Sequence, residues 1–259
     1  MKRIEHVLRI VLFVAGAAFT ILGLGYSLRM DWAVRSHLWT DGPMTISWYG
    51  SMLLSFGPQL VWLGIVREWG ILPGFAAGSI VMFLGGASAV MSVASRESSA
   101  RLWIVGALLA ALGLGSVWMW SWSRGQRVRD PRTTPVVLRW YSAICVVPLL
   151  VASAGLLARH PHVFPWPLNP DSSTLMGWMF LGTGVSFAFA VVQRPWQYVR
   201  TLLMGFLVYD AVLIPYYLGH YARVQPAHEL SLGIFMVVLG SSALLSIWYL
   251  FFDRATRHW

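Results

Sequence analysis

One carboxylate lies in the middle of a long apolar segment. Asp210 falls within "MGFLVYDAVLIPYYLGHY", residues 204–221, which is otherwise typical of a membrane-spanning helix. An ionised acid at mid-bilayer costs about 2.5–3.5 kcal/mol on insertion scales, and intramembrane acids therefore often mark functional sites. At about 1.5 Å per residue, Arg200 and Arg223 are about 15 and 20 Å away along the helix, too far to pair with it. We expect the carboxyl to be uncharged and donating a hydrogen bond, or to face a water-filled cavity.

Helical spacing extends Asp210 into a polar stripe. Tyr217 and Tyr221 follow at i+7 and i+11 on the same face, and His220 lies slightly to one side. Pro215 frees a backbone carbonyl for another donor. Polar residues of other apolar segments, Gln59, Thr183 and Ser186, are plausible partners. The predicted ligand-binding residues are Asp210, Tyr217, Tyr221, His220, Gln59 and Ser186. The alternative is that they form a hydrogen-bond network that only locks helices together.

Metal and cofactor chemistry have little support in the sequence. With nearby acids, the outer-side histidines offer metal-ligand types, but their spacing matches no zinc-enzyme motif, and we expect outer-side histidines to be solvated. Five histidines belong to this group: His37, His160, His162, His220 and His228. Cys145 is the single cysteine, which excludes an intrachain disulfide. Lys2 is the single lysine, so no span can hold a Schiff-base lysine. We predict no metal and no cofactor.

The composition indicates the elements that must position Asp210. The chain has 259 residues, of which 11% are charged, whereas soluble domains carry about 25%. Apolar runs near the ~20 residues needed to cross a bilayer recur along its length. We predict eight spans: 8–28, 46–66, 71–93, 102–121, 136–158, 174–193, 201–220 and 230–252. The fold class is thus an all-α polytopic membrane protein, with an uncleaved first helix behind "MKRIEH".

The net charge of +9 is a topology signal. If the N-terminus is inside, the inner segments hold about twice as many basic residues as the outer ones. Both termini are therefore predicted to be cytoplasmic, with the Arg-rich connector 122–139 on anionic inner-leaflet lipids. Membrane lipids, and no nucleic acid, are the expected partners. The use of Arg in place of Lys suggests a G+C-rich bacterial genome, and hence the plasma (inner) membrane.

An internal repeat organises the chain. At a constant offset of 127, "HLWTDGPMTISWYG" aligns with "FPWPLNPDSSTLMG", and the alignment continues without gaps. Aligned pairs include Trp39/Trp166, Pro43/Pro170, Gly50/Gly177, Gly57/Gly184, Arg67/Arg194, Trp69/Trp196, Gly78/Gly205 and Gly113/Gly240. Because four spans is an even number, the two four-helix repeats are predicted to be parallel. The predicted domains are 1–125 and 136–259, joined by a basic cytoplasmic linker, 126–135.

Function is predicted where the repeats diverge. Asp210 aligns with Phe83 and Pro215 with Ser88, so only the second repeat carries the acid. We predict a protein that binds or moves a small lipophilic or weakly charged molecule at an intramembrane site around Asp210. One alternative is a structural or accessory subunit of a membrane complex. Another is an enzyme on a lipid or isoprenoid substrate with Asp210 as general acid; Glu68, at the inner interface, is the only other acid near a span, and enzymatic activity stays open.

Overall fold

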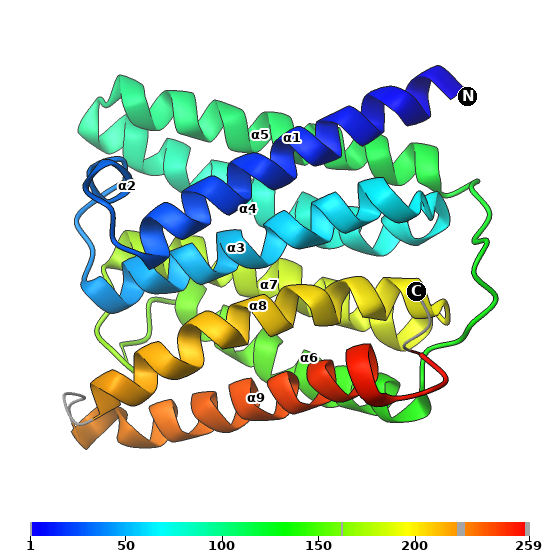
Figure 1. Ribbon diagram of the computed structural model, residues 1–259. Coiled ribbons are helices and arrows are strands. Elements are labelled where there is room, and N and C mark those ends of the chain that lie inside the picture. The colour runs from blue at the N-terminus through cyan, green and yellow to red at the C-terminus, as the bar shows by residue number, and fades with distance from the viewer. Residues whose placement is uncertain (1, 162, 222–225, 257–259) are drawn as a thin grey trace. The chain divides into compact units, whose positions relative to one another are not determined.

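The computed structural model describes residues 2–161, 163–221 and 226–256. Within these ranges every regular element is helical, apart from one isolated antiparallel β-bridge between Thr133 and Pro195. Eight of the described helices are long and apolar enough to cross a membrane (Figure 1). The prediction of an all-helical chain with eight apolar helices is confirmed.

The elements follow one another along the chain in this order. They are α1 (Lys2–Ser27), α2 (Asp31–Arg35), α3 (Pro43–Val66), η1 (Trp69–Ile71), α4 (Leu72–Glu97), α5 (Ala100–Ser123), α6 (Val136–Leu157), α7 (Pro170–Val192), α8 (Trp196–His220), η3 (Pro226–His228), α9 (Glu229–Ile247) and the π-helical η4 (Trp248–Phe252).

Several helices begin before the apolar run that predicted them, because their first turns are polar. Helices α3 and α7 begin at Pro43 and Pro170, where proline is well tolerated because the first helical N–H has no intrahelical partner. The Asn169 side chain caps α7 by accepting a hydrogen bond from the Asp171 amide, 2.9 Å long. Hydropathy finds the apolar part of each helix, whereas capping decides where the helix begins.

The contacts divide the chain into two compact units. Unit 1 comprises residues 1–67, 164–167 and 199–259, and unit 2 comprises residues 68–163 and 168–198. In unit 1, α1 packs along α3; in unit 2, α4 packs against α5 and α7, and α6 packs against α7. Each unit therefore combines helices from both halves of the sequence. The domain boundaries predicted from the repeat describe the sequence halves and stay a prediction.

One close approach occurs in both units at the spacing of the repeat. In unit 2, a Cβ added to Gly78 of α4 would overlap the hydroxyl of Ser186 in α7. In unit 1, a Cβ added to Gly205 of α8 would overlap the amide of Gln59 in α3. Both residues of the second contact lie 127 positions from their counterparts in the first. Close packing on a helical glycine is common where helices cross in membranes, and its recurrence supports the predicted duplication.

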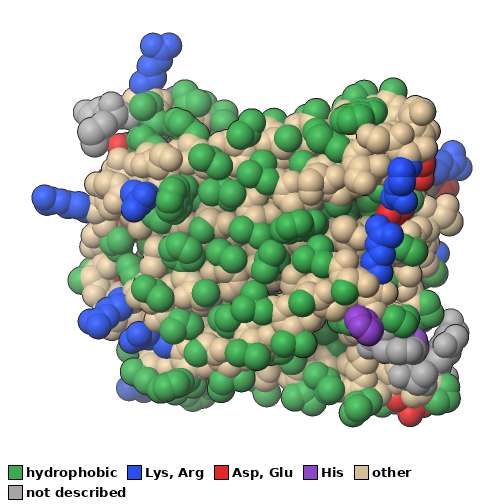
Figure 2. All heavy atoms as spheres, turned by 180° about the vertical axis from the view of Figure 1, so that it is seen from behind, with side chains coloured by type: hydrophobic (Ala, Val, Ile, Leu, Met, Phe, Trp, Pro, Cys, Tyr) green, Lys and Arg blue, Asp and Glu red, His purple; other side chains and the backbone are tan. Residues whose placement is uncertain are grey.

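The helices also carry large exposed apolar side chains. On the face shown in Figure 2, hydrophobic side chains cover the long helices, and Lys and Arg side chains gather at helix ends. On α9, Leu230, Val237 and Leu244 are strongly exposed, whereas Ser242 and Ser246 are buried. Apolar residues outside and small polar residues inside are typical of helices that face lipid. This pattern is consistent with a multi-pass membrane protein.

Candidate functional site

Asp210 lies in unit 1 and is bonded to a serine of the last long helix. Its side chain is fully buried, at 0% exposure, and Oδ2 accepts a hydrogen bond from Ser242 Oγ at 2.6 Å. Oδ1 is also buried and has no hydrogen-bond partner among the described residues. The carboxyl group is therefore half satisfied. A buried polar atom without a partner costs about 1–3 kcal/mol, so this arrangement lowers the stability of the fold unless Oδ1 gains a partner.

No described basic residue of the neighbouring helices lies at the depth of Asp210. Helix α3 contains no charged residue, and the only charged residue of α9 is Glu229 in its first turn. In α8 the basic residues Arg200 and His220 lie ten residues to either side of Asp210. The guanidinium carbon of Arg200 is 4.7 Å from the centre of the Trp62 ring, and His220 Nδ1 is 2.7 Å from the Tyr216 carbonyl oxygen. Asp210 thus has a hydroxyl donor and no ion-pair partner within these helices.

Tyr217 continues the site along α8. It lies two helical turns beyond Asp210 on the same face, is 1% exposed, and its hydroxyl has no partner among the described residues. Its ring contacts those of Trp166 and Phe235, with centroid distances of 5.2 and 5.8 Å. The contacts Asp210–Ser242 and Tyr217–Phe235 run in opposite directions along α8 and α9, so the two helices are antiparallel neighbours.

A short aromatic segment, Phe164–Pro167, contacts Tyr217 through Trp166 and belongs to unit 1, although the residues on either side of it belong to unit 2. Trp166 Nε1 donates to Thr45 Oγ1 at 3.0 Å, and His228 Nδ1 lies 3.0 Å from the carbonyl oxygen of Phe164. Phe164 packs edge-on against Trp48 and Trp166. Phe164, Pro165 and Trp166 of this aromatic segment are buried within unit 1, whereas Pro167 is exposed.

The other predicted ligand-binding residues have separate surroundings. Gln59 is buried against Gly205 in unit 1, and its Nε2 donates to the Ser55 carbonyl at 3.0 Å. Ser186 belongs to unit 2, where its backbone carbonyl accepts from Tyr198 at 2.8 Å. His220 stacks on Tyr216, and Tyr221 is 48% exposed. Gln59 and Ser186 are matching residues of the two units, which sequence reasoning did not recognise.

Ser242, the partner of Asp210, was missed by the sequence analysis. The sequence could have suggested this pair, because the number of residues between each side chain and the α8–α9 connection indicates how deep it lies. Asp210 lies ten residues before the end of α8 and Ser242 lies thirteen residues after the start of α9. Consecutive helices joined by a short connection are usually antiparallel neighbours, so these two residues reach similar depths.

The predicted outer-side histidines are not all solvated. His37 is buried, and its Nε2 lies 2.8 Å from Asp41 Oδ2, while His228 is buried against Phe164. His162, like Arg223, lies outside the described residues. In the described part of the chain, no three His, Cys, Asp or Glu side chains are grouped closely enough to hold a metal ion.

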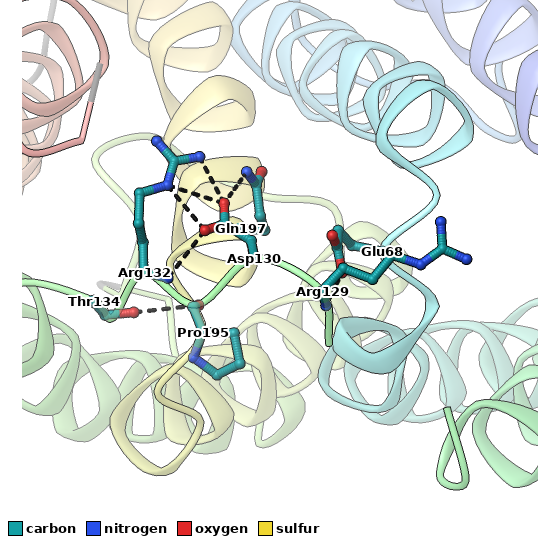
Figure 3. A network of polar contacts seen from close by, with 7 residues as sticks. All are labelled: Glu68, Arg129, Asp130, Arg132, Thr134, Pro195 and Gln197. Carbon is teal, nitrogen blue, oxygen red and sulfur yellow. Dashed lines mark hydrogen bonds and ion pairs between the residues drawn. The ribbon is translucent and has the colours of Figure 1, made fainter. Parts of the chain in front are cut away.

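A second polar cluster, which we call the connector network, lies in unit 2 and also was not predicted. Arg132 donates to both carboxylate oxygens of Asp130, with Nε–Oδ1 and Nη2–Oδ2 distances of 2.9 and 2.6 Å (Figure 3). Gln197 Nε2 donates to the same Oδ2 at 2.6 Å. Hydrogen bonding by Arg132 outweighs the opposing effect of burial and lowers the pKa of Asp130 to about 2.

The connector network fixes the linker to the helix ends of unit 2. The buried Glu68 accepts from the amide of Arg129 at 2.8 Å. The Thr134 amide donates to the Arg194 carbonyl at 2.7 Å, and the Trp196 amide donates to the Arg132 carbonyl at 2.9 Å. The linker predicted at 126–135 therefore has a defined conformation, and its acid is paired within the protein. These contacts identify a structural clamp.

Comparisons with known protein families, with curated proteins and with solved structures found no match for this chain.

Proposed function

We propose that this chain is a multi-pass protein of the bacterial plasma membrane, with both termini cytoplasmic, that binds or moves a small lipophilic or weakly charged molecule at Asp210. The observation that carries the proposal is the half-satisfied carboxyl. Asp210 is fully buried, Ser242 bonds one of its oxygens, and the other has no partner among the described residues. Acids retained at such depth are expensive and usually functional.

The corresponding positions of unit 2 support this proposal. The residues 127 positions before Asp210 and Ser242 are Phe83 and Gly115. In α4 and α5, which correspond to α8 and α9, both polar residues are therefore absent at these positions. Helices α4 and α5 nevertheless pack against each other. The helical scaffold therefore does not require a polar pair at this depth, which favours a specific role in unit 1.

A structural role is the second candidate, and one observation favours it. The 2.6 Å bond from Ser242 joins α9 to α8 in the interior of unit 1. A purely structural pair would hold these helices together and would exchange neither proton nor ligand with the solvent.

Infrared difference spectroscopy of purified protein in lipid tests the proposal. We expect the wild type to show a protonated-carboxyl band that responds to bulk pH and is absent from Asp210→Asn. Asp171→Asn, which alters an outer carboxylate paired with Arg96 in unit 2, is the matched control and should keep the band. A band that ignores pH, together with a lower melting temperature of Asp210→Asn as its main effect, would overturn the proposal in favour of the structural role.

A further inference from the structure

The charge of the Asp210 site indicates what kind of ligand it would accept. Between Thr201 and Gly219, α8 carries no charged residue except Asp210. The facing helix α3 carries none, α9 carries only Glu229, and α1 has none after Arg9. A positive charge that compensates an ionised Asp210 must therefore come from outside these helices. Either a proton or a cationic ligand meets this requirement.

The unpaired polar atoms have a common direction. Asp210 Oδ1 and the Tyr217 hydroxyl are both buried, both without a partner among the described residues, and both on one face of α8. Side chains of a helix lean toward its N-terminus, which directs the Tyr217 side chain back toward Asp210. The two groups together offer one anionic and one neutral oxygen along about two helical turns.

Beyond Tyr217 the surroundings are aromatic. Its ring contacts Trp166 and Phe235, and Phe164 contacts both of these rings with centroid distances of 4.6 and 6.0 Å. Small-molecule sites commonly combine aromatic walls with a few polar groups that fix orientation. The rings would suit the apolar body of a ligand whose charged head lies at Asp210.

The site has too few oxygen ligands for a bare metal ion to be its occupant. Mg²⁺ requires six oxygen ligands and Ca²⁺ six to eight. Asp210, Ser242 and Tyr217 provide four side-chain oxygens, two of which are already hydrogen-bonded to each other. An organic ammonium or phosphonium ion needs a single carboxylate and apolar contacts, which the described residues supply.

We propose that the Asp210 site binds a monovalent organic cation with an apolar body, its charge at Asp210 and its body against Tyr217, Trp166 and Phe235. This inference rests on the proposed function and names its ligand class. A proton and the cation compete for the same carboxyl group, so cation binding weakens as the pH falls.

The probe is tetraphenylphosphonium, titrated calorimetrically into the full chain in lipid nanodiscs, with empty nanodiscs subtracted. Tetraphenylborate, of similar size and opposite charge, controls for partition into lipid. We expect saturable binding of the cation alone, at least tenfold weaker in Asp210→Asn and unchanged in Asp171→Asn. Equal binding of the cation by the wild type and Asp210→Asn would overturn the inference.

A second measurement needs only the wild-type protein, in case Asp210→Asn does not fold. Dicyclohexylcarbodiimide modifies protonated carboxyl groups in apolar surroundings, and mass spectrometry locates the adduct. We expect adduct formation at Asp210 to slow at least fivefold with saturating tetraphenylphosphonium and not with tetraphenylborate. If neither ion slows the modification, cation binding is refuted while the proposed site remains. If the wild type shows no infrared carboxyl band that responds to pH, the proposed site itself is refuted.

Discussion

Asp130 of unit 2 and Asp210 of unit 1 differ in how completely their carboxyl groups are paired. In unit 2 the connector network binds Asp130 through three strong donors, and Asp171 in the first turn of α7 pairs with Arg96 in the last turn of α4 at 2.6 Å. In unit 1 the Asp210 carboxyl lies within the apolar part of α8 with one bonded oxygen. Polar groups that only stabilise a membrane protein can be paired completely near water, whereas an incompletely paired acid in the interior lowers stability. This difference is the reason why we propose the functional site in unit 1 and not in unit 2.

The largest expected effect comes from placing an acid at Phe83, the position of unit 2 that corresponds to Asp210. Phe83→Asp would put a carboxyl without a prepared donor inside α4, and we expect a loss of about 3 kcal/mol or more, seen as a large drop in folded yield and melting temperature. Gly115→Ser should be tolerated alone, because a Cβ there meets no atom within 4 Å. If Phe83→Asp were as stable as the wild type, a buried acid without a donor would cost nothing in unit 2, and the incomplete pairing of Asp210 would not indicate a functional site.

Removal of the Ser242 hydroxyl measures how much the Asp210–Ser242 hydrogen bond stabilises unit 1. Ser242→Ala leaves both oxygens of Asp210 without a described partner, and we expect a loss of about 1–3 kcal/mol in the free energy of unfolding. Ser246→Ala on the same helix is the control, because the Ser246 hydroxyl is buried and has no described partner to lose. Thermal unfolding in detergent compares the two variants. Equal effects would show that the Asp210–Ser242 bond contributes nothing specific.

The connector network predicts a pH dependence for unit 2. Asp130→Asn should cost about 1–2 kcal/mol, since Arg132 and Gln197 lose a charged acceptor. The folded pKa of Asp130, about 2, lies below its unfolded value of about 3.9, so its stabilisation is complete above that unfolded value and is lost as the pH falls toward 2.

Melting temperatures of wild type and Asp130→Asn measured as a function of pH test this sign. The difference between them should be constant above about pH 5 and should shrink below about pH 4. A difference that grows on acidification would contradict the ion pair with Arg132.

The smallest expected effect concerns the aromatic segment. Thr45→Val removes the acceptor of the 3.0 Å bond from Trp166, and we expect a loss of about 1 kcal/mol. Tyr217→Phe, which removes a hydroxyl without a described partner, should leave stability within about 0.5 kcal/mol. Tyr217→Phe should nevertheless weaken tetraphenylphosphonium binding if its hydroxyl contacts the ligand. No change in binding would restrict the polar part of the site to Asp210.

The sequence alone was sufficient to predict the eight apolar helices, the acid within an apolar helix and the face that Asp210 shares with Tyr217. These features depend on local hydropathy and on helical periodicity, which act within one segment of the chain. Tyr221, predicted on the same stripe, is 48% exposed and lies just beyond the last residue of α8, His220.

Only the tertiary structure decided which helices share a unit, that Ser242 bonds Asp210, and that Trp166 packs against Tyr217. It also placed Gln59 and Ser186 on matching glycines of different units. Nearly every helix here is apolar on more than one face and contains small residues, so periodicity does not select its neighbours. In lipid the partners are chosen by close packing and by pairing of buried polar groups, which join segments far apart in the sequence.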